Sequence, residues 1–335
     1  MDTSALRQAP FGSALTDSMS ITSFRGGSWE PERLDRTAPL AIHPAAHALH
    51  YGSSCFEGFK AYRRADGGIH IFRMEQHIER LRQSAELLSL PQPEAAQVQR
   101  MVLALVDRCR ADVPEAPGAL YLRPVLFGTT PNIGAAGVPS AEACLVVLAS
   151  PVWDYFAGGL KPLRILLELS ARTAPNLGRV KTGGNYAAAL GPTLAARRTH
   201  RADQVLFCPN GKVQETGAAN FLLVRDGEIL TRSLDATFLH GVTRDSTLTL
   251  ARDLGYEVSE RIFDIDETLQ WITRGEAVLS GTAAVLTGVG ALIHEGRDIT
   301  VGNGEVGPHT RALRAALIAI QRGDSPDKFG WLTPV

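Results

Sequence analysis

The sequence is short of the residues that several classes of protein depend on. Its 335 residues include four cysteines, widely spaced and without any Cys-x-x-Cys pair, at Cys55, Cys109, Cys144 and Cys208. Such spacing is typical of neither a disulfide framework nor a zinc knuckle, so we interpret these cysteines as reduced packing residues. The nine histidines are scattered, and none pairs with a second histidine and a carboxylate at helical spacing. A metal site is therefore not predicted.

An excess of charge and a long apolar run are also missing. The 34 basic and 35 acidic residues leave a formal charge of −1, which gives no electrostatic reason to expect nucleic acid or an anionic membrane as partner. No apolar run approaches the roughly 20 residues that span a bilayer, and the N-terminal residues do not resemble a secretion signal. With 44% hydrophobic residues, a soluble, cytoplasmic globular protein that binds small neutral or zwitterionic molecules is expected.

Lysine is scarce, and one lysine stands out. Five lysines face 29 arginines (34 basic residues minus 5), so chemistry that requires a deprotonated amine has few candidates. Lys181 lies in the stretch Arg-Val-Lys-Thr-Gly-Gly-Asn-Tyr, beside two glycines that let a bound molecule approach the backbone and five residues before Tyr186. Taken alone, this octapeptide favours a surface lysine before a turn. Other stretches must decide whether Lys181 is a nucleophilic amine.

Hydrophobic periodicity predicts an N-terminal half of strands and two helices. Apolar residues at helical spacing predict helices over 75–88 and 93–112, separated by prolines. Two short alternating runs, 59–63 and 69–72, flank an Ala-Asp-Gly-Gly turn and predict a hairpin. Further strands are expected at 120–127 and 144–149.

A cluster of prolines and glycines at 151–162 predicts an interdomain loop. We therefore expect one domain over 1–150 and a second over 163–335. The second half is predicted to contain these elements: strands at 163–169, 204–208, 212–214, 221–224, 228–231, 278–281 and 284–293, and helices at 186–200, from 243 to 255, and 308–322.

Two small-residue stretches are candidate anion sites. Gly241-Val242-Thr243 directly precedes a predicted helix, whose free backbone amides would face a bound phosphate, although many threonines at helix starts are only N-caps. The second stretch, 280–284, is a Ser-Gly-Thr-Ala-Ala turn after an apolar strand. Neither matches a Walker motif, and no Gly-x-Gly-x-x-Gly opens a helix, so nucleotide-binding folds are disfavoured.

Charged side chains inside apolar segments add weaker indications. Glu215 lies in an uncharged turn between apolar strands, where it is either a satisfied loop acid or the partner of a buried cation such as a protonated pyridine nitrogen. Tyr121 and Arg123 share one face of a predicted strand and could bind a carboxylate together. An arginine on a strand is, however, more often a surface residue.

In chain order, these motifs resemble the branched-chain amino acid aminotransferases, a family of fold type IV pyridoxal phosphate enzymes. The resemblance extends from about Phe11 to Val335. The motifs that carry it are Ala48-Leu49-His50-Tyr51-Gly52, Phe56-Glu57-Gly58, Lys60-Ala61-Tyr62, Tyr121-Leu122-Arg123-Pro124, Ser150-Pro151-Val152, Val180-Lys181-Thr182-Gly183-Gly184-Asn185-Tyr186, Glu215 with Asn220, Leu239 with Gly241-Val242-Thr243-Arg244, and Ser280-Gly281-Thr282-Ala283.

The resemblance implies an α/β (α+β) fold with a smaller N-terminal α/β domain and a larger C-terminal pseudo-barrel domain. It implies pyridoxal 5'-phosphate as the cofactor, held as a Schiff base on Lys181, which would be displaced by the substrate amine and then move a proton between the substrate α-carbon and the cofactor's aldimine carbon. Glu215 would keep the pyridine nitrogen protonated, Tyr186 would bind the phenolic oxygen and Leu239 would pack on the ring. The phosphate would be bound by Arg73, Gly241, Val242, Thr243 and Thr282.

The resemblance also implies the substrates and the assembly. Leucine, isoleucine or valine would exchange an amino group with 2-oxoglutarate, giving branched 2-oxo acids and glutamate. The α-carboxylate would meet Tyr121 and the amides of Thr282 and Ala283, and Arg123 would accept the distal carboxylate of glutamate. An apolar pocket would be lined by Tyr51, Phe56, Tyr155 and Tyr186. A homodimer is expected, with the loop 128–138 near the neighbouring subunit's site.

Some positions depart from the family pattern, and other reactions stay open. Ala135, Ala218 and Ala219 replace larger or different residues common in relatives, which bears on substrate preference. Ala284-Val285-Leu286-Thr287 stands where some animal relatives have Cys-x-x-Cys, so no redox switch of that kind is predicted. The alternatives are an aminodeoxychorismate lyase or a D-amino acid aminotransferase of the same fold, and a protein that binds the cofactor without turnover.

Overall fold

The computed structural model describes residues 10–153, 160–174 and 176–335. The chain forms two compact units. The first unit comprises Met1–Tyr155, Val180–Gly183 and Ile320–Val335, and the second comprises Phe156–Arg179 and Gly184–Ala319. Sequence analysis assigned all of 163–335 to one domain, whereas the segment around Lys181 and the C-terminal segment belong to the first unit. Residues 154–159 of the predicted interdomain loop, 151–162, lie outside the described residues.

The first unit is built on a sheet with strand order β17-β6-β5-β7-β8-β1-β2, in which β3 also pairs with β1 and β4 with β7. The long strands β7 and β8 form its centre through an antiparallel register that includes Leu122 opposite Ala149. Both strands are apolar along most of their length and almost wholly buried, as expected for the middle of a covered sheet. Its strands are β1 (Ser18–Arg25), β2 (Ser28–Trp29), β3 (Arg33–Arg36), β4 (Ser54–Phe56), β5 (Phe59–Arg63), β6 (Ile69–Phe72), β7 (Ala119–Gly128), β8 (Ala143–Val152) and β17 (Leu332–Pro334).

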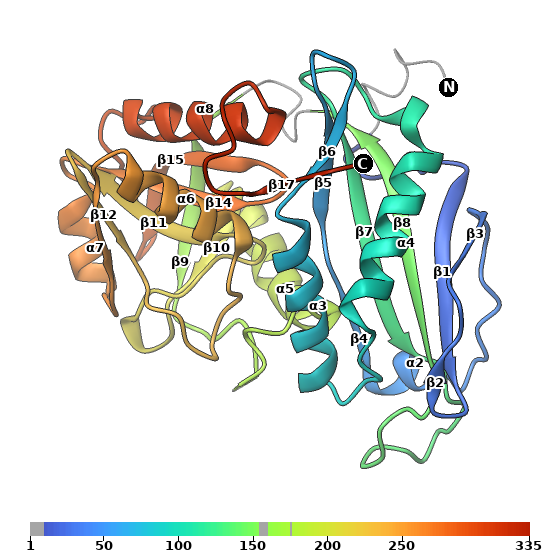
Figure 1. The fold of residues 1–335 in the computed structure, drawn as a ribbon. Coiled ribbons are helices and arrows are strands. Elements are labelled where there is room, and N and C mark those ends of the chain that lie inside the picture. The colour runs from blue at the N-terminus through green and yellow to red at the C-terminus, as the bar shows by residue number, and fades with distance from the viewer. Residues whose placement is uncertain (1–9, 154–159, 175) are drawn as a thin grey trace. The chain divides into compact units, whose positions relative to one another are not determined.

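Two amphipathic helices cover one face of this sheet, α3 (Met74–Leu87) and α4 (Ala95–Arg108), which Figure 1 shows alongside the strands. Their buried residues recur at helical spacing and pack with strand residues such as Leu120 and Leu145 into one core cluster. The predicted helices are thus confirmed, although α4 ends earlier and a 3-10 turn (Arg110–Asp112) follows it. The predicted hairpin is also confirmed, as β5 and β6. A short helix, α2 (His47–Tyr51), precedes β4 and was not predicted.

The second unit contains a mixed sheet with strand order β10-β9-β15-β14-β11-β12-β13, and β16 pairs with β15. Parallel pairing joins β9 to both β10 and β15, whereas β11, β14 and β15 are antiparallel neighbours. Its strands are β9 (Leu163–Glu168), β10 (Gln204–Phe207), β11 (Asn220–Arg225), β12 (Glu228–Thr231), β13 (Glu257–Glu260), β14 (Glu276–Gly281), β15 (Val285–His294) and β16 (Arg297–Thr300).

Helices cover both faces of this second sheet. Leu248 of α6 and Leu313 of α8 pack on one face, and Ile265 of α7 packs on the other. The helices are α5 (Gly183–His200), α6 (Val242–Asp253), α7 (Ile265–Trp271) and α8 (Pro308–Arg322), with a 3-10 turn at Pro209–Gly211. The antiparallel sheet of the first unit, the mixed sheet of the second unit and their covering helices confirm the predicted α/β (α+β) class.

One predicted strand is wrong. Residues 212–214 form no strand, because Lys212 makes only an isolated bridge to Asp264 while the Gln214 amide donates to the Phe207 carbonyl. These isolated bridges do not extend into a strand ladder.

All four cysteines are buried and free, which confirms their interpretation as reduced packing residues. Within the described ranges, no helix is both long and apolar enough to cross a membrane.

Candidate active site

Lys181 is anchored within the first unit through its backbone. Its carbonyl accepts a hydrogen bond of 3.0 Å from the Phe56 amide, at the end of β4. Its amide donates to the Ser84 hydroxyl on α3, over 3.1 Å. The Nζ atom lies 5.0 Å from the centre of the Phe56 ring. A strand and a helix therefore fix the main chain on both sides of the amine.

Tyr121 and Arg123 of β7 reach the same ring. The Arg123 Nη2 atom donates to the Tyr121 hydroxyl over 2.9 Å, and the Arg123 guanidinium carbon lies 4.6 Å from the centre of the Phe56 ring. Gly58 lies directly against Tyr121, where a Cβ atom would collide with the phenol oxygen. The first unit thus brings together Phe56, Tyr121, Arg123 and Lys181.

Arg73 and Tyr51 are placed by different means. Arg73 is the N-cap residue of α3, with a left-handed φ of 54°. Its amide donates to the Trp331 carbonyl over 2.7 Å, and its guanidinium stacks at 5.0 Å on the Trp331 ring. Tyr51 is partly exposed on α2, and its hydroxyl donates to the Ile133 carbonyl. Tyr155, also predicted for the site, lies outside the described residues.

A buried ionic cluster lies close to both backbone anchors of Lys181, since Glu57 follows Phe56 and its partners His77 and Arg80 share α3 with Ser84. The Glu57 carboxylate is fully buried and accepts from His77 Nδ1 at 2.7 Å, from Arg80 Nε at 2.6 Å and from Arg80 Nη2 at 2.9 Å. Burial by itself raises the pKa of Glu57, but the interactions with Arg80 and His77 together outweigh it and hold this pKa well below its usual range. Burial lowers the pKa of His77, against the opposing effect of Glu57, so the imidazole is neutral and donates its Nδ1 proton.

In the second unit, Glu215 is buried and surrounded by donors. Its Oε1 accepts from the Leu239 amide at 2.9 Å and from Arg172 Nη2 at 2.5 Å, and its Oε2 accepts from the Asn220 side chain at 3.2 Å. Both members of the Arg172–Glu215 pair are less than 5% exposed. These donors favour the ionised carboxylate.

Asn220 connects the hydrogen bonds around Glu215 to the N-terminus of α6. The Asn220 side chain also donates to the Leu239 carbonyl over 2.8 Å, and a Cβ atom on Gly241 would collide with the Asn220 side-chain oxygen. Gly241 is the N-cap residue of α6, and no described side chain caps its first turn. Asn220 pairs with Ser280 at the end of β14, just before the turn that carries Thr282 and Ala283. Glu215, Leu239, Gly241 and the Ser280 strand end are therefore neighbours.

Two groups in this neighbourhood are suited to an anion. The first-turn amides of α6 point out of the helix without a side-chain cap. The Ser280 hydroxyl is buried and has no hydrogen-bond partner among the described residues. Val242 and Thr243, the first two helical residues, are themselves nearly buried. A phosphate group bound here would satisfy donors that the protein leaves open, and Glu215 would supply the carboxylate that a pyridinium nitrogen requires.

Sequence analysis missed several of these residues. Arg172 lies nine residues before Lys181, and nothing in its local sequence distinguishes it from a surface arginine. Ser84, His77 and Arg80 share one face of α3, at a spacing of three and four residues. That spacing is visible in the sequence, but the acid they surround lies 20 residues before His77.

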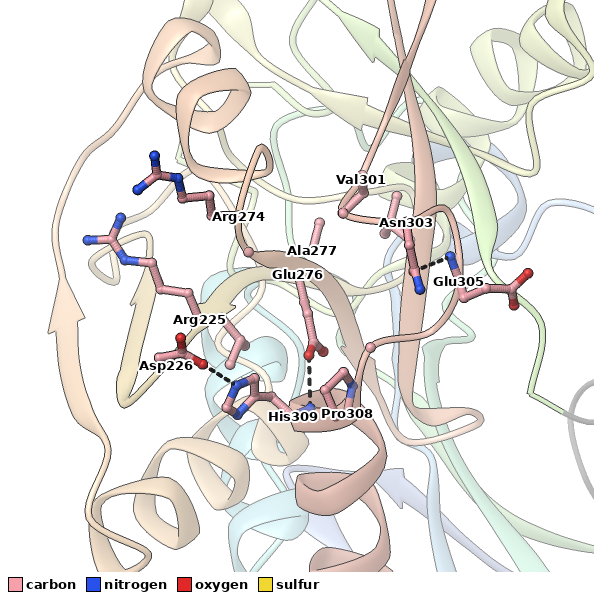
Figure 2. Close-up of a pocket in the computed structure, with 15 residues that line it drawn as sticks. Arg225, Asp226, Arg274, Glu276, Ala277, Val301, Asn303, Glu305, Pro308 and His309 are labelled. Atoms are coloured by element: carbon pink, nitrogen blue, oxygen red, sulfur yellow. Dashed lines mark hydrogen bonds and ion pairs between the residues drawn. The ribbon is translucent and has the colours of Figure 1, made fainter.

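A separate pocket of about 260 Å³ lies in the second unit and is shown in Figure 2. The Glu276 carboxylate faces the backbone of His309 and accepts from the amides of His309 and Thr310, both at 2.8 Å. His309 Nε2 lies 3.2 Å from Asp226. These charges are used to cap α8 and to join it to the β11–β12 hairpin. No residue predicted for the active site is among the described residues that line this pocket.

Comparisons with known proteins agree with this arrangement. The family model described as amino-transferase class IV matches residues 54–292. The chain is 36% identical to branched-chain-amino-acid aminotransferase 2 of Bacillus subtilis, over 98% of this chain and 92% of that protein. It is 39% identical to a probable branched-chain-amino-acid aminotransferase of Streptomyces coelicolor, over 96% of this chain and 91% of that protein.

Solved structures give the same result. The crystal structure of the branched-chain aminotransferase from Thermoproteus uzoniensis with norvaline is similar, with a TM-score of 0.77 and 27% identity, over 95% of this chain and 99% of that chain. The branched-chain amino acid aminotransferase from Thermobaculum terrenum, solved in its PLP form, has a TM-score of 0.76 and 25% identity, over 94% and 97% of the two chains. The Escherichia coli branched-chain amino acid aminotransferase has a TM-score of 0.74 and 28% identity, over 93% and 98%.

Fold and site together define a pyridoxal phosphate enzyme of fold type IV. Within the class IV aminotransferases, the chain belongs to the family of branched-chain amino acid aminotransferases. The enzyme is accordingly a branched-chain amino acid transaminase, and its cofactor is pyridoxal 5'-phosphate.

Proposed function

We propose that the enzyme transfers the amino group of leucine, isoleucine or valine to 2-oxoglutarate, with Lys181 carrying the cofactor as a Schiff base. The observation that carries this proposal is the fixed main chain of Lys181, held by Phe56 and Ser84 beside the Tyr121–Arg123 pair. When bound, pyridoxal phosphate supplies an electron sink for the bond that breaks at the substrate α-carbon. Once displaced by the substrate amine, the freed amine of Lys181 would take the α-proton and deliver it to the cofactor carbon that it had held.

The other residues of the proposed site bind and orient the cofactor. Glu215, held by Arg172, Asn220 and the Leu239 amide, keeps a proton on the pyridine nitrogen. The open amides at the start of α6, together with Arg73 and Thr282, bind the phosphate. Tyr186 binds the phenolic oxygen and Leu239 packs on the ring.

We assign the substrate contacts to the two ends of the amino acid. Tyr121 and the amides of Thr282 and Ala283 bind the α-carboxylate, and Arg123 binds the distal carboxylate of glutamate. The aromatic side chains Tyr51, Phe56 and Tyr186 surround the branched side chain. One site then serves both half-reactions, because an apolar chain and a distal carboxylate reach different groups.

Visible absorbance tests the half-reactions separately. L-Leucine alone should convert the yellow, cofactor-loaded protein to the pyridoxamine form, and 2-oxoglutarate added afterwards should restore the first spectrum. D-Alanine serves as the control amine and should leave the spectrum unchanged. A spectrum that responds to D-alanine or aminodeoxychorismate but not to leucine would overturn the substrate assignment. A spectrum that stays constant with every amine would indicate a cofactor-binding protein without turnover.

We propose further that the enzyme is a homodimer joined through an apolar patch on the first unit. Leu49, Ile133 and Val138 are between 61% and 71% exposed. They lie on α2 and on the loop between β7 and β8, which are linked by a 3.0 Å contact from His47 Nε2 to the Val138 carbonyl. Exposed apolar side chains gathered on linked segments are typical of an interface.

The patch predicts the effect of a charged substitution. The double variant Ile133→Asp/Val138→Asp should be monomeric, because two carboxylates in an apolar interface cannot be solvated. Size-exclusion chromatography with light scattering measures the mass, with wild type expected at twice the mass of one chain. Leu254→Asp, at a residue that is 51% exposed after α6, is the matched control and should stay dimeric. A variant that remains dimeric would place the interface elsewhere.

A further inference from the structure

The backbone of Val285 has a conformation that its side chain disfavours. Its φ is 62°, in the left-handed region, and the side chain is 5% exposed. Valine is β-branched, and such residues rarely adopt positive φ because Cβ crowds the following carbonyl. Val285 opens β15 directly after the short turn 282–284. Strain of this kind persists only where the surrounding structure imposes it, and it gathers at functional sites.

Glycine would be the ordinary choice at this position. A left-handed residue next to a hairpin turn is the geometry of a G1 bulge, which glycine normally supplies. The neighbouring register, with Gly281 opposite Val285 and Ser280 opposite Leu286, shows that the hairpin is otherwise regular. The chain therefore retains a strained residue where a relaxed one was available.

Arg314 of α8 holds this residue from both sides. Its Nη1 atom donates to the Ala284 carbonyl and, over 3.0 Å, to the Leu286 carbonyl, the two residues that flank Val285. Leu286 packs with Leu248 of α6 and Leu313 of α8 in one buried cluster. The guanidinium thus ties the turn to a helix that is itself fixed in the core.

The turn 282–284, which Arg314 ties to α8, carries donors that we assign to anion binding. Thr282 and Ala283 occupy it, and the buried Ser280 hydroxyl, which has no partner among the described residues, precedes it by two residues. A relaxed turn of small residues would sample several orientations of its amides. Binding an anion to it would then require ordering first, which weakens affinity.

We infer that Val285 and Arg314 are positioning residues, which hold the amides of Thr282 and Ala283 oriented toward the substrate α-carboxylate. This inference rests on the proposed function, since it adds two residues to the carboxylate site. Neither residue needs to touch the substrate. Their effect is to fix the turn before binding, at the cost of strain in the backbone.

A pair of substitutions at Val285 separates backbone freedom from side-chain loss. Val285→Gly should raise the KM for both leucine and 2-oxoglutarate about tenfold, because both present the same carboxylate to a loosened turn, while kcat changes less than about threefold. Val285→Ala removes the same buried methyl groups but keeps a Cβ, and its KM should rise less. Glu295→Gly relaxes a left-handed residue, φ 50°, at the other end of β15 and should leave KM unchanged.

Arg314 provides a second and independent test. Arg314→Met should raise KM as Val285→Gly does, and Arg314→Lys, which keeps a donor, should recover part of the loss. The double variant Val285→Gly/Arg314→Met should be no worse than the more severe single variant, because both act on one turn. Effects that add in full, or a normal KM in Val285→Gly, would overturn the inference.

A binding measurement without turnover completes the design. 4-Methylvaleric acid is a branched carboxylate without an amine, so its dissociation constant from the loaded enzyme reports binding of the carboxylate and apolar chain without any turnover. This constant should rise about tenfold in Val285→Gly and stay unchanged in Glu295→Gly. Wild-type protein that binds the carboxylate but does not convert leucine would refute the proposed function only. Equal dissociation constants in wild type and Val285→Gly would refute the positioning role only.

Discussion

Replacing Lys181 with alanine should lower turnover of leucine with 2-oxoglutarate by at least about 10³-fold, the scale of a lost proton-transfer group and nucleophile. The guanidinium of Arg123, which lies 4.6 Å from the centre of the same Phe56 ring, cannot replace the amine because it does not give up its proton. The visible spectrum of the cofactor should also lose its response to pH, because a Schiff base with the protein no longer forms.

Two further variants identify what is lost. Lys181→Arg keeps the positive charge but has no amine that deprotonates, and it should be as inactive as Lys181→Ala. Lys212→Ala is the matched control, since Lys212 is an exposed lysine in a surface ion pair with Asp264, and it should retain wild-type activity. Circular dichroism should be unchanged in all three. Turnover near the wild-type rate in Lys181→Ala would refute the assignment of this residue.

Regular elements of this fold were predictable where their pattern repeats. The hairpin of β5 and β6 and helix α8 have the predicted bounds, because an Asp-Gly-Gly turn and a proline start mark their ends clearly. Strand β1 was not predicted, because only two apolar residues, Met19 and Ile21, alternate with polar ones at 18–22; in the structure the polar Ser20 and Thr22 are just as buried. Helix α7 has seven residues, too few for a helical period to emerge.

The site residues likewise divide into those that the sequence predicts and those that it does not. Glu215 was recognisable because a single acid in an apolar, uncharged turn needs a partner. Arg172 was not, because only tertiary contacts separate a buried arginine from an exposed one. The left-handed backbone of Val285 was beyond sequence reasoning, which would place glycine there. Local rules fail at this turn because Arg314 of α8, 28 residues after Leu286, imposes its conformation.

The second large effect is expected on stability. Glu57→Gln should lower the free energy of unfolding by about 3–5 kcal/mol at pH 7, because it leaves the Arg80 charge buried without its counter-ion. Urea unfolding of the variant and wild type measures this difference. Glu79→Gln is the matched control on the same helix, where Glu79 forms an exposed pair with Arg82 at 2.9 Å, and it should cost less than about 1 kcal/mol. Equal losses in the two variants would refute the role of the buried pair.

The difference in free energy of unfolding between wild type and Glu57→Gln should depend on pH with a definite sign. Burial raises the pKa of Glu57, but Arg80 and His77 together hold it below its unfolded value, so the stabilising effect of the ionised Glu57 is complete above that unfolded value, about 4.3, and is lost as pH falls toward the folded pKa. Glutamine cannot titrate, so the gap between wild type and Glu57→Gln should narrow as pH is lowered below about 4. A gap that is constant from pH 7 to pH 3 would contradict an ionised Glu57.

The consequences of Glu57→Gln should extend to Lys181. Glu57 directly follows Phe56, whose amide holds the Lys181 carbonyl, and its partners His77 and Arg80 share α3 with Ser84, which accepts from the Lys181 amide. Both anchors of the Lys181 main chain therefore meet at one carboxylate. Loosening that carboxylate should reduce kcat with leucine more than it raises KM, because the amine is misplaced while the carboxylate-binding groups of β7 stay in place.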